Sequence, residues 1–289
     1  MNVKIQINNL FFAYGHRPVL NISQVAFERG KAYGIVGKNG VGKTTFFKCL
    51  VNIITSYKGS VFIDDKEVRN HLEVLKNVGI VLDDMHLYRN RTGIFNLQYF
   101  AGLRGGAPLD TVMALATELE IADALDMKVS KYSLGMTKKL QLLISIMNDA
   151  EILIFDEPFR GLDAKSVDWF RNYLVELTRQ GRTILISSHV QEDIESIADH
   201  VFVMENGDFS VSYDLNDTTQ SYIYSVEVSA PELLQRLLEN AGIASTLAGK
   251  LLQFTASEDA YRQVFKEAVA QDVEFFQVKK EVLFAKFVR

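Results

Sequence analysis

Short, mostly apolar runs alternate with segments of helical periodicity along the first 213 residues. The strand candidates are residues 3–7, 25–28, 32–36, 60–63, 78–82, 152–155, 183–187 and 201–204. The helix candidates between them include residues 43–52, 164–179 and 191–198. This alternation of short strands and helices predicts an α/β fold built on a parallel sheet.

Residues 92–148 interrupt the alternation. Apolar side chains recur there at helical spacing, as at Ile94, Leu97 and Phe100, and there is little strand signal. We therefore expect a helical subdomain over about residues 85–148, inserted into the α/β domain.

A polar patch at residues 214–220 predicts a domain boundary. Strand and helix patterns alternate again at residues 222–228, 231–241, 251–255, 258–270 and 273–278. This order predicts a small α+β domain over 214–289, in a split βαβ arrangement, after a first domain over 1–213. The length of 289 residues agrees with two domains, because a domain of ~150 residues is common.

Composition and charge exclude several classes of protein. Hydrophobic residues make up 48% and charged residues 23% of the chain, as in folded rather than disordered proteins. The net charge of −5 argues against a general affinity for nucleic acid. Cys49 is the single cysteine, so no internal disulfide forms, and its place on a predicted helix favours the core.

The chain carries no membrane-spanning pattern. No run approaches the ~20 apolar residues of a transmembrane helix. The first residues alternate polar and apolar side chains, unlike a signal peptide. We expect an intracellular soluble protein, so any membrane component of its system would be a separate chain.

A glycine-rich motif follows the strand candidate at residues 32–36. Residues 37–44 fit the pattern GxxxxGK(S/T) of a phosphate-binding loop, in which glycines let backbone N–H groups turn toward an anion. The helix that follows adds its positive end. We expect Lys43 to reach the β and γ phosphates and Thr44 to bind Mg²⁺. The predicted nucleotide contacts of the loop are Gly37, Lys38, Asn39, Gly40, Val41, Gly42, Lys43, Thr44 and Thr45.

Two acidic residues end the strand candidate at residues 152–155. Asp156 and Glu157 follow four apolar residues, which is the Walker B pattern. Asp156 is expected beside Thr44 as a ligand of Mg²⁺, and Glu157 one step further out, to polarise the attacking water. A strand that ends in a charged turn would also explain these residues, but the upstream phosphate loop favours the catalytic interpretation.

Together with these motifs, four further segments resemble the ATP-binding subunit of an ABC transporter. They are Tyr14, residues 132–136 (Tyr-Ser-Leu-Gly-Met), residues 161–163 (Gly-Leu-Asp) and residues 187–189 (Ser-Ser-His). In this family they correspond to the aromatic that stacks on adenine, the signature, the D-loop and the switch histidine. The resemblance covers nearly all of residues 1–213. It implies a P-loop NTPase cassette with a RecA-like α/β core, an antiparallel β subdomain and a helical signature subdomain.

The resemblance also implies how such a cassette works. Ser133 and Gly135 would contact the γ phosphate held by a second cassette, so that a homodimer, or a pair of cassettes, closes around two ATP molecules. Ser133 also has the simpler interpretation of an ordinary helix cap. Asp163 would bridge the dimer. Lys43, Glu157 and His189 are the expected catalytic residues.

Two departures from the family pattern stand out. Leu134 and Met136 replace a glycine and the glutamine of the signature, a form that resembles exporters of antibiotics and bacteriocins. Asp83 aligns with the Q-loop glutamine, although a shift of one residue would place Asp84 there. Because a carboxylate is a harder Mg²⁺ ligand than an amide, we expect Asp83 to join Thr44 and Asp156 at the metal. Hydrolysis would then be slower, or more dependent on the membrane partner.

These inferences predict an Mg²⁺-dependent ATPase that energises an exporter. Its partners would be a separate multi-span permease and a second cassette, but no nucleic acid, and it would lie in the cytoplasm against the inner face of the membrane. The alternatives are a soluble ABC ATPase of translation or DNA repair, and a regulator with little turnover.

Two groups of side chains have open or unremarkable interpretations. The apolar residues near the helical insertion either receive a permease helix or belong to the local core; they are Leu87, Tyr88, Phe95, Tyr99 and Phe100. Lys138 and Lys139 are expected on a solvated helix face.

Overall fold

The computed structural model describes residues 3–217 and 220–288. Residues 218–219 of the predicted boundary and residues 1–2 of the N-terminal alternation lie outside this part. The chain divides into two compact units, Met1–Asp214 with Phe287–Arg289, and Leu215–Lys286. Each unit has its own cluster of buried apolar side chains.

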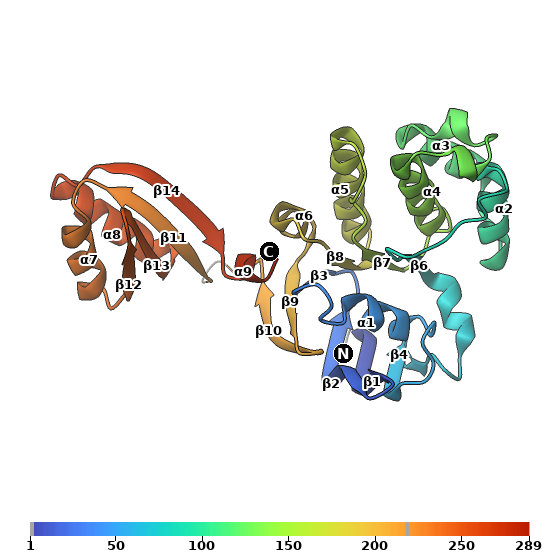
Figure 1. The fold of residues 1–289 in the computed structure, drawn as a ribbon, viewed down its shortest axis with the longest axis horizontal. Coiled ribbons are helices and arrows are strands. Elements are labelled where there is room, and N and C mark those ends of the chain that lie inside the picture. Colours follow the sequence, from blue (N-terminus) through green and yellow to red (C-terminus); the bar gives the residue numbers. More distant parts are fainter. Residues whose placement is uncertain (1–2, 218–219, 289) are drawn as a thin grey trace. The chain divides into compact units, whose positions relative to one another are not determined.

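A six-stranded sheet in the order β10-β9-β3-β8-β7-β6 runs through the first unit (Figure 1). Its strands are β3 (Ala32–Val36), β6 (Val78–Val81), β7 (Ile152–Asp156), β8 (Thr183–Ser187), β9 (His200–Glu205) and β10 (Asp208–Asp214). All neighbours are parallel except β9 and β10. Strands β3, β7 and β8 are buried along their whole length, which explains their continuous apolar runs. The predicted parallel sheet is confirmed, whereas β10 was not predicted.

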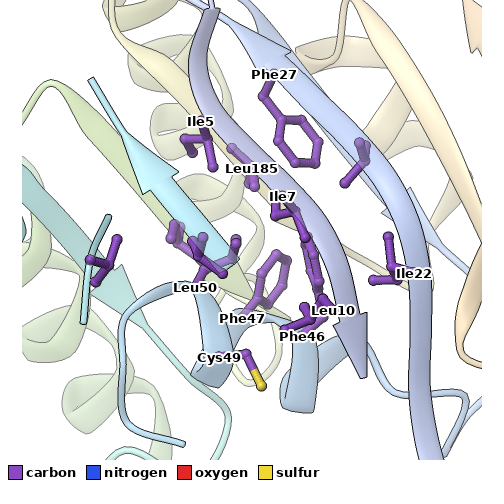
Figure 2. Close-up of a cluster of buried hydrophobic side chains, with 14 of the residues drawn as sticks. Ile5, Ile7, Leu10, Ile22, Phe27, Phe46, Phe47, Cys49, Leu50 and Leu185 are labelled. Carbon is purple, nitrogen blue, oxygen red and sulfur yellow. The ribbon is translucent and has the colours of Figure 1, made fainter. Parts of the chain in front are cut away.

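A second, antiparallel sheet in the order β2-β1-β4-β5 shares the core of the first unit. Its strands are β1 (Val3–Tyr14), β2 (Arg17–Glu28), β4 (Lys58–Ile63) and β5 (Lys66–Glu67). Figure 2 shows Ile7 and Leu10 of β1 beside Phe46 and Phe47 of α1 (Lys43–Leu50), all fully buried. This packing fixes the helix that follows the glycine-rich loop against the sheet. Both β1 and β2 are longer than predicted.

Helices fill the chain between β6 and β7 and connect the remaining strands. The helical insertion consists of α2 (Gly93–Leu103), α3 (Leu109–Glu118) and α4 (Leu134–Ile146), with 3-10 helices at Ala122–Ala124 and Val129–Lys131. Elsewhere the first unit has α5 (Ala164–Arg179), α6 (Gln191–Ile197) and a 3-10 helix at Leu72–Asn77. The interpretation of Lys138 and Lys139 as solvated is wrong. Both are buried on α4, at 5% and 6% exposure, because this helix packs against its neighbours over most of its surface.

The second unit is a four-stranded antiparallel sheet with two helices. Its elements are β11 (Ser221–Val228), α7 (Pro231–Asn240), β12 (Ser245–Ala248), β13 (Leu251–Ser257), α8 (Glu258–Ala270) and β14 (Phe275–Val282), and α9 (Ala285–Val288) follows. The order β12-β13-β11-β14 places β13 between β11 and β12, which is a split βαβ arrangement. Strand β12 was not predicted, because only four mostly exposed residues form it.

None of the helices within residues 3–217 and 220–288 combines the length and the hydropathy that crossing a bilayer requires.

Candidate functional site

A cavity of about 1040 Å³ opens in the first unit, where the chain leaves the carboxyl ends of β3, β6, β7 and β8. Loops at this edge of an open α/β sheet form ligand sites in many folds. The lining contains the predicted residues Tyr14, Lys38, Asn39, Gly40, Val41, Gly42, Lys43, Thr44, Thr45, Asp83, Asp156, Glu157 and His189. It also contains residues that the sequence analysis missed, namely Arg17, Pro18, Val19, Arg160, Asn206 and Gly207.

The glycine-rich loop has a backbone that side chains would disrupt. Gly37 has a φ of 154°, and a Cβ on it would lie 2.4 Å from the carbonyl oxygen of Met204. Gly42 has a φ of 121° and precedes α1 without a side-chain cap on its first turn. Gly42 and the first residues of α1 line the cavity, so the uncapped N–H groups and the helix dipole offer an anion site there.

Lys43 lies folded over this loop. Its Nζ donates a hydrogen bond to the carbonyl oxygen of Gly37 at 2.6 Å. Burial lowers the pKa of Lys43, while the negative charges of Glu157 and Asp156 oppose that effect. A buried ammonium held by the carbonyl oxygens of Gly37 and Lys38 gains from a phosphate brought into the cavity, since the anion supplies the countercharge.

Asp156 joins the loop to two strands of the sheet. It is 2% exposed at the end of β7, and Ser187 Oγ donates a hydrogen bond to its Oδ1 at 2.6 Å. Thr44 Oγ1 donates to Oδ2. Thr44 and Asp156 offer the hard oxygen ligands that Mg²⁺ prefers. Among the described residues, no three His, Cys, Asp or Glu side chains cluster in a way that could hold a metal ion by themselves.

Glu157 has a strained backbone and a buried carboxylate oxygen without a hydrogen-bond partner. Its φ is 50°, a rare conformation for a residue other than glycine, and its N–H donates to the carbonyl oxygen of Ser187 at 3.2 Å. The carboxylate Oε1 lies 3.2 Å from Nε2 of His189 but has no partner in hydrogen-bond geometry. Burial raises the pKa of Glu157, and the charge of His189 works against that rise. Strain and a raised pKa are common in catalytic bases.

The structure separates the two adjacent aspartates. Asp83 lines the cavity, and Nη1 of Arg160 donates a hydrogen bond to its Oδ2 at 3.3 Å. Asp84 is outside the lining and forms an ion pair with Lys48 of α1 at 2.5 Å. Of the two candidates for the Q-loop position, Asp83 is therefore the one that reaches the site. Nothing in the local sequence pointed to Arg160, which is 77 residues away from it.

The rim of the cavity holds a further predicted residue and a missed glycine. Tyr14 is the last residue of β1 and is 56% exposed, with its ring edge-to-face against Phe12 at 4.8 Å between centroids. Gly207 has a φ of 80°, and a Cβ on it would lie 2.2 Å from the carbonyl oxygen of Val19. The turn after β9 therefore packs closely against Val19, which also lines the cavity. The only sign of this turn in the sequence was a glycine after a predicted strand.

Four predicted residues lie outside the cavity lining: Gly37, at the start of the glycine-rich loop, and Ser133, Gly135 and Asp163, which belong to the signature and the D-loop. Ser133 caps α4, and its Oγ accepts a hydrogen bond from the N–H of Met136 at 3.1 Å. Next to it, a Cβ on Gly135 would lie 2.9 Å from the carbonyl oxygen of Gly161. Asp163 caps α5 and pairs with Lys139 at 2.9 Å, and this lysine is the main cause of the lowered pKa of Asp163. The signature and the D-loop therefore contact each other within one chain.

Known proteins are similar to this chain in sequence and in fold. Residues 20–160 match the family described as ABC transporter. The chain is 33% identical to the bacitracin transport ATP-binding protein BcrA of Enterococcus faecalis, over 83% of this chain and 80% of that protein. It is 30% identical to the lantibiotic transport ATP-binding protein SrtF of Streptococcus pyogenes, over 70% of this chain and 87% of that protein.

Solved structures agree with the predicted fold class. The structure described as an ATP binding subunit of an ABC transporter superimposes with a TM-score of 0.69 at 20% identity, over 91% of this chain and 99% of that one. A nucleotide-free ATP-binding cassette from an ABC transporter gives a TM-score of 0.63 at 19% identity, over 73% of this chain and 91% of that one. At these identities the likeness concerns the fold, and the predicted cassette fold is confirmed.

Replacing Glu157 by Gln is expected to stabilise the nucleotide-free protein by about 1 kcal/mol at neutral to alkaline pH. Because burial raises the pKa of Glu157, wild-type stability falls as the pH rises from the ordinary value of 4.5 through the folded-state value. The variant lacks this carboxylate, so its advantage shrinks as the pH falls back toward 4.5. Thermal unfolding across this pH range measures the difference, with Glu118→Gln at an exposed site as the control. A variant no more stable than the wild type at alkaline pH would contradict the expectation.

Proposed function

This chain belongs to the family of ABC transporter ATP-binding proteins, as its motifs predicted, and on that premise we propose that it drives export through a separate membrane subunit. It is the ATP-binding subunit of such a transporter, with ATPase activity coupled to transport. The observation that carries the proposal is the single cavity that the phosphate loop shares with Asp156, Glu157 and His189. The relatives named for bacitracin and lantibiotic transport support export over a role in translation or DNA repair.

In this proposal the triphosphate lies along the loop and the start of α1. Lys43 leaves the carbonyl oxygen of Gly37 for the β and γ phosphates, and the N–H groups of residues 38–45 surround them. Tyr14 at the rim offers its exposed ring to the adenine. Gly37, Gly40 and Gly42 have φ angles of 154°, 78° and 121°, which side-chain-bearing residues rarely adopt and which let the loop backbone turn toward an anion.

Thr44, Asp156 and Asp83 are the proposed ligands of Mg²⁺. The side chains of Thr44 and Asp156 are hydrogen-bonded to each other, and Asp83 lines the same cavity. When bound, the ion neutralises charge on the phosphates during transfer.

Glu157 is the proposed general base. Its unpaired Oε1 accepts a hydrogen bond from water and orients it for in-line attack on the γ phosphorus. The new P–O bond forms as the bond to the β–γ bridging oxygen breaks, and ADP and phosphate result. His189 is 3.2 Å from Glu157 and is placed to hold both the carboxylate and the γ phosphate.

A second cassette completes the proposed assembly. Ser133, Gly135 and Asp163 lie outside the cavity of their own chain, at the N-terminal ends of α4 and α5. Both helix ends attract anions. Two copies arranged head to tail would place each signature on the partner's γ phosphate.

The helical insertion carries the proposed surface for the membrane subunit. Tyr88 and Tyr99 are 46% and 40% exposed, with ring centroids 4.9 Å apart, and Phe95 and Phe100 pack at their edges. Leu87 is only 8% exposed and belongs to the core instead. We define Tyr88, Phe95, Tyr99 and Phe100 as the aromatic patch. A permease helix bound there would hold the protein at the inner face of the membrane.

Glu157→Gln is expected to trap a dimer with ATP and to slow hydrolysis by about 10²- to 10⁴-fold, since the general base is removed while the binding groups remain. Size-exclusion chromatography with ATP and Mg²⁺ measures the dimer. Adding Lys43→Ala to the same variant should abolish the dimer, because the phosphates lose their main cation. A monomer that hydrolyses ATP at the wild-type rate would refute the role of Glu157.

Asp83→Gln is expected to raise the basal ATPase rate roughly threefold to tenfold and to increase the Mg²⁺ concentration needed for half-maximal rate. The amide is a weaker ligand and carries no charge to repel the γ phosphate. Rates measured over a Mg²⁺ series test both effects, and Asp84→Asn, which changes an aspartate outside the cavity, is the control. Unchanged rate and Mg²⁺ dependence would remove Asp83 from the metal site.

Replacing Tyr88 and Tyr99 together by Ala is expected to reduce co-purification of a multi-span membrane protein from native membranes by about tenfold or more, because aromatic side chains dominate interface energies. ATP binding should be retained. Leu72→Ala, which removes an exposed apolar side chain outside the helical insertion, serves as the control. Full recovery of the membrane protein with the double variant would exclude the aromatic patch as the contact.

A further inference from the structure

Asp83 and Arg160 place opposite charges on the cavity wall. Asp83 follows β6 and Arg160 follows β7, which are neighbouring strands, and both side chains line the cavity. Their atoms Oδ2 and Nη1 are 3.3 Å apart. We propose that Arg160 is a positioning residue that holds and neutralises Asp83, so that the triphosphate can bind beside a carboxylate that would otherwise repel it. This inference rests on the proposed function as an ATP site.

The charges around the cavity show why Asp83 needs a cation. Asp156 and Glu157 already contribute two carboxylates to the lining. Asp156 is satisfied by two hydroxyl groups, which supply hydrogen bonds but no charge. Among the residues that the structure describes, Arg160 is the one cation in ion-pair contact with Asp83. Without it, the lining would keep three carboxylates beside the cations of Arg17, Lys38 and Lys43, so a ligand with several negative charges would meet stronger repulsion at Asp83.

The signature helix supports the same segment from the other side. Gln141 of α4 donates a hydrogen bond to the carbonyl oxygen of Met85 at 2.7 Å, which anchors the chain two residues after Asp83. Lys138 lies three positions earlier on α4, on the same helix face. Burial lowers the pKa of Lys138, and the charge of Asp83 is the largest effect that opposes it. The segment that follows Asp83 is therefore anchored to α4, while Arg160 is the cation that Asp83 contacts directly.

The pair is suited to a role in binding rather than in stability. The side chain of Arg160 is 70% exposed and that of Asp83 is 45% exposed. Exposed ion pairs contribute little to folding, so removing either partner should leave the fold intact. The neighbouring pair of Lys48 and Asp84 has the same chemistry, but neither residue lines the cavity. It provides a matched control.

The test measures the affinity for ATP, ADP and AMP by calorimetry in EDTA, where no metal contributes. Arg160→Gln is expected to weaken ATP binding about tenfold, ADP binding less and AMP binding least, since the repulsion grows with phosphate charge. Arg160→Lys should retain most of the affinity. With Asp83→Asn already present, Arg160→Gln should have no further effect, because no carboxylate remains to neutralise. Lys48→Gln and Asp84→Asn should leave all three affinities unchanged.

Two outcomes would overturn this inference and leave the proposed function standing. If the wild type binds ATP and Arg160→Gln binds it equally well, Asp83 does not need Arg160. If Arg160→Gln weakens binding to the same extent with and without Asp83→Asn, Arg160 acts on the nucleotide directly rather than through Asp83. A wild-type protein that binds no ATP, or whose affinity is unaffected by Lys43→Ala, would instead refute the proposed function.

Discussion

The buried carboxylate of Asp156 is the constraint on which the site depends. A carboxylate that is 2% exposed is stable only when its oxygens are hydrogen-bonded. Thr44, from the helix after β3, and Ser187, at the end of β8, each satisfy one oxygen. Through these two hydrogen bonds, Asp156 connects the ends of β7 and β8 to the helix that follows β3, and these three strands are neighbours in the sheet. The phosphate loop, Glu157 and His189 take their places around the cavity because of this junction.

The residues beside the junction are less well satisfied, and this is consistent with catalysis. Glu157 combines a left-handed backbone with a buried oxygen that lacks a hydrogen-bond partner. Lys43 is a buried ammonium held by loop carbonyl oxygens. Both groups would gain partners from a bound nucleotide and its attacking water, so the binding energy can offset the cost of burying them. Asp83 adds a third carboxylate to this wall, and the charge of Arg160 balances it.

In the proposed dimer, each chain would contribute two different halves of a site. The cavity holds the groups suited to bind and cleave a triphosphate, whereas the signature serine and glycine lie outside its lining. Within the chain, the signature packs against the D-loop: a Cβ on Gly161 would lie 3.0 Å from the side chain of Leu134, and Lys139 pairs with Asp163. In the proposed dimer, these contacts would link the signature to the segment that begins at Glu157, four residues before Gly161.

The sequence by itself determined the local parts of this protein. The phosphate loop was readable because glycine spacing dictates backbone conformation, and β3, β7 and β8 because strands buried on both faces are apolar throughout. Only the tertiary structure decided that Asp83 rather than Asp84 reaches the cavity, that Arg160 meets it across 77 residues, and that Lys138 and Lys139 are buried. Short strands such as β12 also depend on their neighbours, since four mostly exposed residues carry no pattern of their own. The physical reason is that periodicity and turn chemistry act over a few residues, whereas burial and ion pairing depend on which distant segments the packing brings together.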